Sequence, residues 1–353
     1  MAVYLKASSM VSAQDTLNRS DMPENLVNAE NSALKTRPCN YKDYLPAASL
    51  RRMSRIVKFS LVSAFDCLNQ LEDFTPDAII TSTGLGCLED TITFLTQMHQ
   101  NEEKLMNPSS FIGSTHNSIG GQIALLKKLR IPNLTHTQME GSFESALIDA
   151  MMMLEDGEAN NILVGGFDEI TPETILLWKN MGCLSENEVN RETLVNSTNK
   201  GIIPGEGAGF FALSKNKDQS SKVKLCGIRI RHSYNGGLNV AVSEFLSEYD
   251  MKPGDIDLLI LGVDGTPDTH TLLNLTNNDF ENATVAAFKH LSGSFNTDTT
   301  FAFWLAGCAI VNGKIHPECC LKGANIRKFK HVLLVNSSKA GNFTFIYLND
   351  DLE

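Results

Sequence analysis

The sequence predicts an α/β fold, with mostly parallel strands covered by helices, built as two successive halves. Apolar runs typical of buried strands alternate with segments of helical periodicity along the 353 residues. The 25 glycines, against two tryptophans, suit the tight turns that connect strands to helices. The polar stretch at residues 214–222 is the most linker-like segment, and the same alternation starts again after it.

The first half opens with a predicted strand at the N-terminus. A polar, irregular segment over residues 15–40 follows it, and we expect this segment to lie on the surface. Apolar positions recur at helical spacing over residues 50–71, 118–129 and 142–155, which predicts three helices. Short apolar runs beginning at Ala78 and Asn161 predict buried strands.

The second half shows the same pattern after residue 222. The predicted elements, in order, are a strand at 223–231, a helix at 240–249, a strand at 258–263, a helix near Phe288 and strands at 332–335 and 343–348. Two α/β halves of this kind fit a duplicated architecture.

Composition excludes several classes of function. A formal net charge of -11 argues against a general nucleic-acid binder or a binder of anionic membranes, because both need a basic face. No window reaches the roughly eighteen apolar residues of a membrane helix, so we expect a cytoplasmic protein. The eight cysteines form no C-x-x-C pair and the histidines do not cluster at metal spacing, so we expect no metal. The glycine-rich segments match no nucleotide-binding fingerprint, and we expect no cofactor.

Several segments, in the correct order, resemble the β-ketoacyl synthase family. Residues 130–146 resemble the stretch around the nucleophile, and residues 163–169 resemble the family's A-G-G-A-E. Gly205-Glu-Gly-Ala-Gly209 looks like its G-E-G-A-G turn, and residues 336–341 resemble its C-terminal N-S-F-G-F-G-G loop. The resemblance implies a thiolase-like five-layer αβαβα sandwich of two pseudo-repeated halves. It implies an N-terminal half of synthase type at residues 1–215 and a C-terminal half at residues 216–353.

The residues that resemble the catalytic motifs depart from the family at each essential position. Counting from Arg130 or back from Gly165 places Glu140 where the family has its nucleophilic cysteine. The H-G-T motif is replaced by Asp264-Gly-Thr266, so Asp264 stands at the first histidine. In the K-x-x-x-G-H motif the lysine remains as Lys289, but Ser294 stands at the second histidine.

Condensation needs the groups that are missing. A thiolate carries the growing acyl chain, and two imidazoles stabilise the enolate formed when the malonyl unit loses carbon dioxide. Glu140 and Asp264 place hydrogen-bond acceptors where the family has donors, so we predict that condensing activity is lost. The three altered residues are relics that hold loops together, or they line a shaped but unreactive acyl cavity. The enzymatic alternative is a new carboxylate pair in an acyl-thioester hydrolase or decarboxylase.

The resemblance implies partners as well as a fold. Chain-length factors of type II polyketide synthases lose the cysteine and form the silent half of a heterodimer with an active ketosynthase. Residues 289–293 and 301–306 resemble synthase-like proteins of aryl-polyene and flexirubin clusters. We therefore predict a chain-length-factor-like subunit of fatty acid, polyketide or aryl-polyene biosynthesis. A homodimer that binds an acyl chain or carrier protein without chemistry is the remaining alternative.

Two surfaces are candidates for contact with partners. In proteins of this fold the strand before the nucleophile turn, here residues 134–137, pairs across a dimer, because a free strand edge is a liability. Two clusters of basic residues have a simple structural explanation. Each can form a solvated helix face, or its cations can interact favourably with the negative end of a helix. The resemblance implies that Arg51 and Arg52 lie near where synthases dock the acidic acyl carrier protein, and we expect Arg55, Lys127, Lys128 and Arg130 to take part in that docking. The residues of the two clusters are Arg51, Arg52, Arg55 and Lys58 on helix 50–71, and Lys127, Lys128 and Arg130 at the end of helix 118–129.

Overall fold

The computed structural model contains two sets of strands with the same internal order. It describes residues 2–28, 33–104, 106, 108–185, 189–195, 201–232, 237–266, 268–277, 280–325, 327–338 and 341–350. In the first half the strands lie in the order β3-β2-β4-β5-β1, and in the second half in the order β8-β7-β10-β11-β6, with β9 beside β8. The strands are β1 (Val3–Val11), β2 (Ala78–Ser82), β3 (Asn133–His136), β4 (Asn161–Asp168), β5 (Gly207–Ser214), β6 (Val223–Arg231), β7 (Leu258–Leu261), β8 (Thr284–Ala287), β9 (Cys320–Lys322), β10 (His331–Ser337) and β11 (Phe343–Asn349).

Strand directions repeat in the same way. In each half three strands run parallel, β3-β2-β4 and β8-β7-β10, and the next two are antiparallel to their neighbours. A short antiparallel pairing of β1 with β6, from Val3 opposite Leu225 to Leu5 opposite Val223, joins the two halves. The prediction of mostly parallel sheets is therefore wrong in part, because the first and last strand of each half pair antiparallel beside the parallel core.

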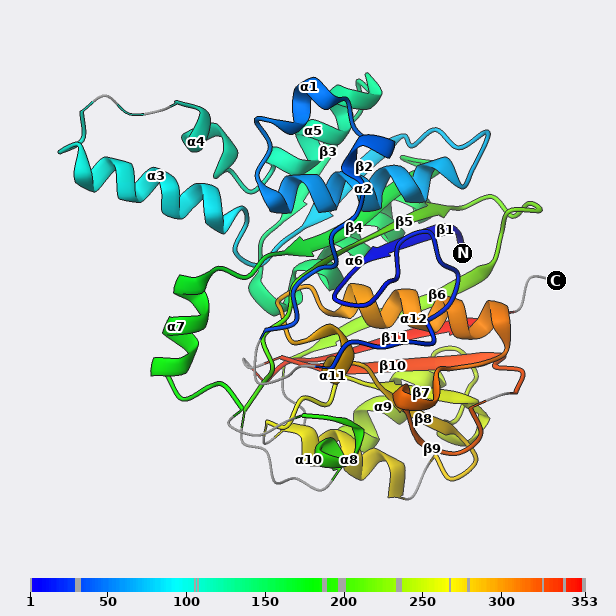
Figure 1. Ribbon diagram of the computed structural model, residues 1–353. Helices are drawn as coiled ribbons and strands as arrows, with labels where there is room; N and C mark the ends of the chain where they lie inside the picture. The colour runs from blue at the N-terminus through cyan, green and yellow to red at the C-terminus, as the bar shows by residue number, and fades with distance from the viewer. Residues whose placement is uncertain are drawn as a thin grey trace.

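Helices cover the strands on both outer faces and also fill the middle. The helices are α1 (Ala47–Leu50), α2 (Arg55–Asn69), α3 (Leu88–Gln100), α4 (Pro108–Gly113), α5 (Ser118–Lys127), α6 (Ser142–Glu155), α7 (Pro172–Asn180), α8 (Arg191–Val195), α9 (Leu238–Ser247), α10 (Asp268–Asn274), α11 (Lys289–Ser292) and α12 (Thr299–Asn312). In Figure 1, α2 and α5 lie above the first set of strands, α6 and α12 between the two sets, and α9 and α10 below the second set.

Alternating strand residues divide the interior into three cores, which makes the layers αβαβα. In β2, Ile79 packs into the outer core with α2, whereas the next residue, Ile80, packs into the central core with α6 and α12. In β7, Ile260 faces the central core and Leu259 faces the second outer core, which α9 covers. Strands buried on both faces read as continuous apolar runs, which is why the sequence marks them so clearly.

The central helix α12 shows why this layer excludes water. Its residues Thr299 to Ile310 are all buried, among them Phe301, Phe303 and Trp304. A helix that is apolar on all sides has no solvent face and must lie between two layers. Among the helices that the structure describes, none is long and apolar enough to cross a membrane.

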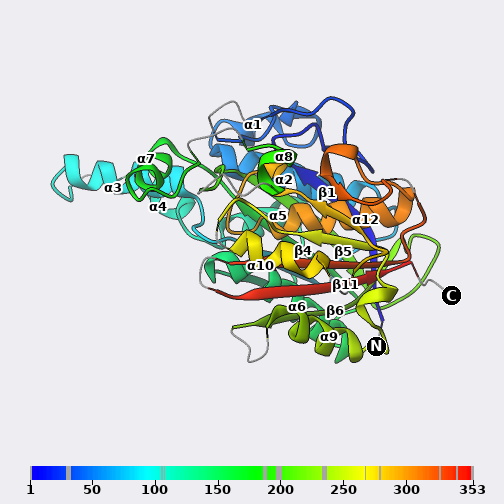
Figure 2. The ribbon, with the colours of Figure 1, turned by 90° about the horizontal axis from the view of Figure 1, so that it is seen from below.

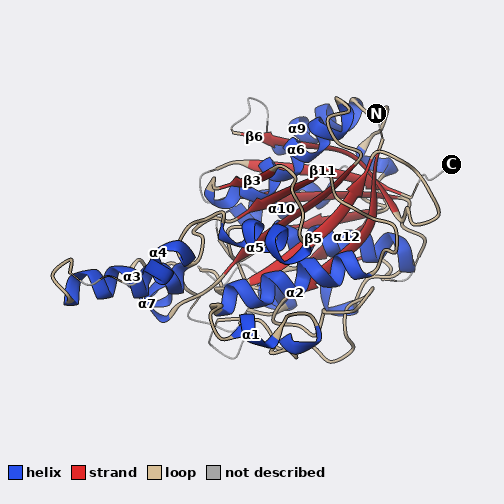
Figure 3. Ribbon diagram, turned by 90° about the horizontal axis from the view of Figure 1, so that it is seen from above, coloured by secondary structure: helices blue, strands red, loops and turns tan. Residues whose placement is uncertain are grey.

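Three helices stand away from the layered body. Figures 1 and 2 show α3, α4 and α7 projecting on one side, and Figure 3 shows the same arrangement from above. Neither α3 nor α4 contains a buried residue, and α7 buries only Thr174. Several apolar side chains of these helices are exposed, among them Leu95, Phe111 and Leu176.

Two local predictions need correction. The helix expected at residues 50–71 is two helices, α1 and α2, separated by a turn that contains Arg51 and Arg52, so these arginines do not share a helix with Arg55. The segment 15–40 is irregular but does not lie wholly on the surface: Leu34 is 3% exposed and its N–H donates to Pro204 O at 2.8 Å.

The G-E-G-A-G segment is not simply a turn, because Gly207 already begins the buried strand β5. Gly205 is needed for a close approach. A Cβ there would lie 2.3 Å from Ser292 O and 2.6 Å from Gly293 Cα. This contact holds the start of β5 against the segment that follows Lys289.

Gly205→Ala is expected to lower the free energy of unfolding by about 1–3 kcal/mol, because backbone on both sides must move. Denaturant unfolding measures the change. The matched control is Gly121→Ala in α5, where nothing lies within 4 Å of an added Cβ and alanine favours the helix. Equal effects of the two substitutions would contradict the packing argument.

Candidate functional site

A cavity of about 420 Å³ lies where loops at the carboxyl ends of parallel strands meet. Glu140 follows β3, Asp264 follows β7, Lys289 follows β8, and Asn336 lies near the end of β10. Carboxyl ends of parallel strands in one half lie at one edge, which is a common place for ligand sites. The described lining consists of Glu140, Trp178, Gly182, Cys183, Gly201, Ile202, Asp264, Thr266, Lys289, Ser294, Phe295, Asn296, Asp298, Asn336, Ser337 and Ser338.

The structure brings together all four positions that the sequence singled out. Glu140, Asp264, Ser294 and Lys289 line the same cavity, although more than 100 residues separate the first from the others. Of the C-terminal loop at residues 336–341, Lys339 and Ala340 lie outside the described residues.

Lys289 is the centre of a buried ion cluster. Its Nζ lies 3.3 Å from Asp298 Oδ2 and 3.7 Å from Asp264 Oδ2, and the residue is 5% exposed. Burial alone would lower the pKa of Lys289, but Asp298, Asp264 and Glu140 outweigh it and raise this pKa above its usual range. The lysine therefore stays charged and compensates carboxylates that would be costly to bury alone.

Asp264 also holds its own loop. Its Oδ1 accepts hydrogen bonds from the Thr266 N–H at 3.0 Å and from Thr266 Oγ1 at 2.6 Å, which closes a turn at the end of β7. One oxygen is thus used by the turn and the other by Lys289. These contacts favour a structural role for Asp264.

Glu140 lies on a strained connection between β3 and α6. It belongs to a 3-10 turn at Met139–Gly141, and Met139 has a φ of 54°, in the left-handed region. Ser142 Oγ secures the turn by donating to Met139 O at 2.7 Å and accepting from the Gln138 N–H at 2.7 Å. The turn thus holds Glu140, which lines the cavity, at the position where the resemblance implies a nucleophile.

Backbone hydrogen bonds fix the position of Ser294, whereas its hydroxyl has no hydrogen-bond partner among the described residues. The Ser294 N–H donates to Ile203 O at 2.7 Å, and its carbonyl accepts from the Gly205 N–H at 3.0 Å. The side chain is 7% exposed, and Oγ finds no hydrogen-bond partner among the described residues. An unpaired buried hydroxyl in a cavity wall is a group that a ligand can satisfy.

A hydrogen-bonded chain leads from the ion cluster into the central layer. Asn336 Nδ2 donates to Asp298 Oδ1 at 3.1 Å and to Thr299 Oγ1 at 2.8 Å. Thr299 Oγ1 donates to Glu144 Oε1 at 2.6 Å. Burial raises the pKa of Glu144 to about 7, partly opposed by the Thr299 hydrogen bond. Part of the Glu144 population is therefore protonated at neutral pH.

Sequence reasoning missed Asp298, Glu144 and Trp178. Glu144 directly follows Phe143, and Asp298 directly precedes the apolar run of α12, so each is a charged residue at the border of a buried segment. A charged residue at such a border is a signal that the sequence alone contains. Trp178 comes from α7, and no motif connects it with the cavity.

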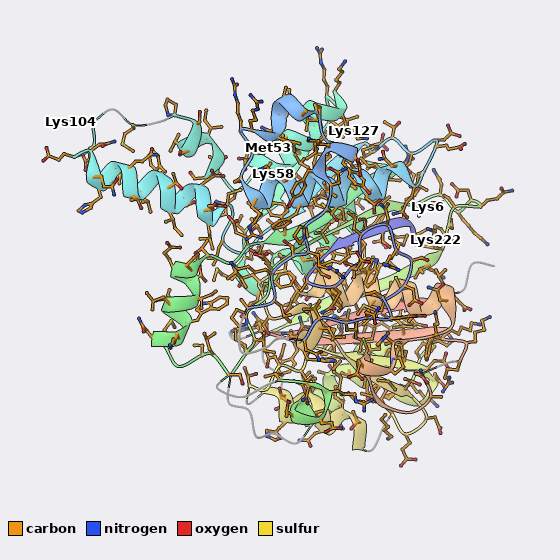
Figure 4. The ribbon with its side chains drawn as sticks, viewed as in Figure 1. Lys6, Met53, Lys58, Lys104, Lys127 and Lys222 are labelled. Carbon is orange, nitrogen blue, oxygen red and sulfur yellow. The ribbon has the colours of Figure 1, made fainter. Side chains whose placement is uncertain are left out.

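The candidate docking residues are exposed, with the exception of Arg55. Arg51 and Arg52 line a groove of about 830 Å³ together with Leu125 of α5, which is 68% exposed. Figure 4 shows Met53, also part of the groove lining, and Lys127 on this side of the molecule. Lys127 Nζ lies 4.6 Å from the centre of the Phe65 ring.

Arg55 is the exception, because it is engaged within the chain. Its Nη2 donates to Glu206 Oε2 at 2.6 Å, and its Nη1 contacts Glu206 Oε1. The buried Glu206 also accepts from the Thr36 and Ile170 N–H groups at 2.8 and 3.0 Å. Arg55 thus neutralises a buried carboxylate beside the groove. Lys128 and Arg130 are exposed after the end of α5.

The comparisons with known proteins agree with this architecture. Residues 25–184 match the family model of the β-ketoacyl synthase N-terminal domain. No curated protein matches the chain. Among the described residues, no group of three His, Cys, Asp or Glu side chains could hold a metal ion.

Three solved structures resemble the chain over nearly its whole length. The ishigamide ketosynthase/chain length factor has a TM-score of 0.78 at 17% identity and covers 99% of this chain and 98% of that chain. The ketosynthase ApeO in complex with its chain length factor ApeC, from Xenorhabdus doucetiae, has a TM-score of 0.76 at 16% identity, with 99% and 98% covered. The type II acyl-carrier protein complex AntDE:AntF has a TM-score of 0.76 at 12% identity, with 99% of both covered. The predicted thiolase-like fold is confirmed.

Proposed function

Since residues 25–184 match the family model of the β-ketoacyl synthase N-terminal domain and the whole chain has the thiolase-like fold, we propose that it is a non-condensing, chain-length-factor-like subunit. It pairs with an active ketosynthase and shapes the cavity in which that enzyme's product grows. The observation that carries this proposal is the ion cluster of Lys289, Asp264 and Asp298, which lies where condensation would need donors.

The cavity has the wrong charge for condensation. Decarboxylation of a malonyl thioester develops negative charge on the thioester oxygen, and preorganised donors must stabilise it. Asp264 and Ser294 stand at the two expected donor positions, and Lys289 is already held by two carboxylates. Glu140 offers a carboxylate, which is a weaker nucleophile toward a thioester than a thiolate. Because both Asp264 oxygens are engaged, a hydrolase with Glu140 and Asp264 as acid and base is not favoured.

The free edge of β3 supports pairing with a second subunit. Strand β3 lies at the end of the strand order and is hydrogen-bonded only to β2 among the described strands. Leu134 on this strand is 41% exposed and Met139 after it is 51% exposed. An exposed strand edge with apolar side chains favours pairing, and a twofold partner covers it.

The projecting helices carry further exposed apolar side chains. Their exposed apolar residues are Leu95 and Phe111–Ile112 on α3 and α4, and Leu176, Leu177 and Met181 on and after α7. Contiguous apolar patches on a folded chain usually mark an interface. One of the similar structures is a ketosynthase in complex with its chain length factor, which is the type of complex we propose here.

The groove beside Arg51 and Arg52 supports docking of an acyl carrier protein. It combines two exposed cations with the exposed Leu125, and Lys127 and Lys128 lie at the end of the same helix. An acidic partner would be guided there by charge and held by apolar contact.

The test is purification of the tagged chain from its native cell under gentle conditions. We expect a stoichiometric complex with a ketosynthase that has an intact cysteine and two histidines. The variant Leu134→Arg is expected to abolish this complex, because it places a charge on the proposed interface. Val240→Arg is the matched control, since Val240 is 44% exposed on α9, away from β3.

Two outcomes would refute the proposed function. One is a homodimer without a ketosynthase partner. The other is decarboxylation of a malonyl thioester by the chain alone, lost in Glu140→Ala, which would identify an enzyme instead.

A further inference from the structure

Cys183 gives the cavity of about 420 Å³ a thiol. Among the eight cysteines four are buried, and the other four, Cys39, Cys183, Cys226 and Cys320, are partly exposed. Of these four, Cys183 belongs to the described lining of the cavity. Burial raises the pKa of the Cys39 and Cys320 thiols, which lowers the share of each that is ionised and reactive. The cavity thus contains a nucleophilic side chain, although Glu140 stands at the expected position.

Backbone hydrogen bonds fix Cys183 between the end of α7 and the segment that precedes β5. Its N–H donates to Trp178 O at 3.0 Å, and its carbonyl accepts from the Ile202 N–H at 2.9 Å. The next residue of that segment, Ile203, accepts from the Ser294 N–H at 2.7 Å.

Cys183 and Ser294 therefore lie on opposite sides of one extended segment. Isolated bridges pair Leu184 with Ile202 and Pro204 with Ser294, and successive residues of an extended chain direct their backbone groups to opposite sides. Two strand spacings then separate the backbones of Cys183 and Ser294, about 10 Å in total. A ligand attached to Cys183 must be elongated to reach Ser294.

The Ser294 hydroxyl is an independent indication that a ligand binds here. The residue is 7% exposed and lines the same cavity, and Oγ has no hydrogen-bond partner among the described residues. A buried hydroxyl without a partner is costly, and a ligand oxygen can accept its proton. The oxygen of a thioester on Cys183 stays next to the sulfur. A 3-oxo oxygen lies two carbons further along the acyl chain and can approach Ser294.

The rest of the described wall suits the carbon chain of an acyl group. Trp178, Ile202 and Phe295 line the same cavity. Their aromatic and alkyl surfaces can remove methylene groups from water, which is favourable. Small-molecule sites commonly combine such surfaces with a few polar groups that fix the orientation of the ligand.

We propose that Cys183 accepts a 3-oxoacyl group from a thioester and that Ser294 selects for its 3-oxo oxygen. The Cys183 sulfur attacks the thioester carbonyl carbon, a new C–S bond forms, and the C–S bond to the donor thiol breaks. The proton that Cys183 loses passes through solvent to the departing thiolate. One thioester and one thiol thus give another thioester and another thiol, without an oxidant or a reductant.

This inference deepens the proposed function and rests on it for the class of ligand, because the product of a partner ketosynthase is a 3-oxoacyl thioester. No carbon–carbon bond forms in the step, so the chain remains non-condensing. Cys183 holds the acyl group, and the altered residues Glu140 and Asp264 take no part in the transfer.

The test incubates the full chain at pH 7.5 with the N-acetylcysteamine thioesters of 3-oxohexanoate and hexanoate. Mass spectrometry of the intact protein follows acylation, and peptide mapping locates it. We expect one acyl group per chain, on Cys183. Relative to the same two reactions of free cysteine, the 3-oxo thioester should react about tenfold faster than the hexanoyl thioester. Absence of acylation, or equal labelling of Cys183, Cys226 and Cys320, would overturn the proposal.

Variants separate the two roles. Cys183→Ala is expected to abolish acylation, whereas Cys320→Ala, at another partly exposed thiol, should be acylated like the wild type. Ser294→Ala should still be acylated on Cys183 but lose about threefold to tenfold of the preference for the 3-oxo thioester, because only the hydroxyl is removed. Ser247→Ala, at an exposed serine of α9, should keep the preference. An unchanged preference in folded Ser294→Ala would refute the selection by Ser294.

Failure of this inference is separable from failure of the proposed function. If a ketosynthase co-purifies with the chain but Cys183 is not acylated, only the acyl transfer is wrong. If Cys183 is acylated with the expected preference but no ketosynthase co-purifies, the partner is wrong and the acyl acceptor stands.

Discussion

Lys289→Met is expected to lower the free energy of unfolding by about 3–5 kcal/mol at pH 7. The substitution removes the cation that lies 3.3 Å from Asp298 and 3.7 Å from Asp264. Methionine has a similar length, so the cavity left behind is small, and the loss reports mainly on two buried carboxylates without a counter-ion. Denaturant unfolding of both proteins measures it.

The pH dependence of this difference has a definite sign. The pKa of Lys289 is raised in the folded state by Asp298, Asp264 and Glu140, which outweigh burial. A group with a raised pKa stabilises the fold fully below its unfolded pKa of about 10.4 and loses this contribution as the pH rises through the folded pKa. The contribution of the lysine's own proton should thus be constant near neutrality and shrink in strong alkali. The difference between the wild type and Lys289→Met should also shrink in acid, where the carboxylates that the variant leaves without a counter-ion become protonated.

Two further variants make this prediction specific. Lys222→Met, at an exposed lysine, should change stability by less than about 0.5 kcal/mol. The double variant Lys289→Met with Asp298→Asn should recover part of the loss, because it removes one of the stranded charges. If Lys289→Met behaves like Lys222→Met, the ion cluster does not exist in solution.

Glu144→Gln is expected to lose less stability than the wild type when the pH rises from 5 to 8. Burial raises the pKa of Glu144 from 4.5 to about 7, so the folded state binds this proton more tightly than the unfolded state. Stability from such a group is present at low pH and falls as the pH rises from about 4.5 through about 7. The full effect corresponds to about 3 kcal/mol. Glutamine has no proton to lose and keeps an oxygen that can accept from Thr299.

The measurement is the free energy of unfolding at pH 5, 6, 7 and 8. The wild type should lose stability across this range, since burial also raises the pKa of Asp168 to about 6 and that of Glu169 to about 7. Glu144→Gln should lose less, whereas Glu158→Gln, at an exposed site, should follow the wild type. A Glu144→Gln curve parallel to that of the wild type would contradict the raised pKa.

Much of the fold was accessible from sequence for a physical reason. Helix 142–155 and strand 223–231 were predicted with the bounds that the structure has. Both carry a periodic apolar pattern that local geometry imposes. Strands β8 and β9 were missed because three or four residues carry too little pattern, whereas the strand expected at residues 134–137 is β3. The break between α1 and α2 was missed because the apolar spacing continues across it.

The sequence by itself indicated two successive α/β halves. It also singled out Glu140, Asp264, Lys289 and Ser294, because each follows a strand within a short motif. Only the tertiary structure decided what surrounds them. Asp298 reaches Lys289 because α12 lies in the central layer, and Glu144 reaches Thr299 across 155 residues of sequence. Arg55, one of the candidate residues for carrier-protein docking, neutralises Glu206, 151 residues away. Such pairs depend on how the layers pack. A local sequence pattern does not show which charged residues will be buried next to each other.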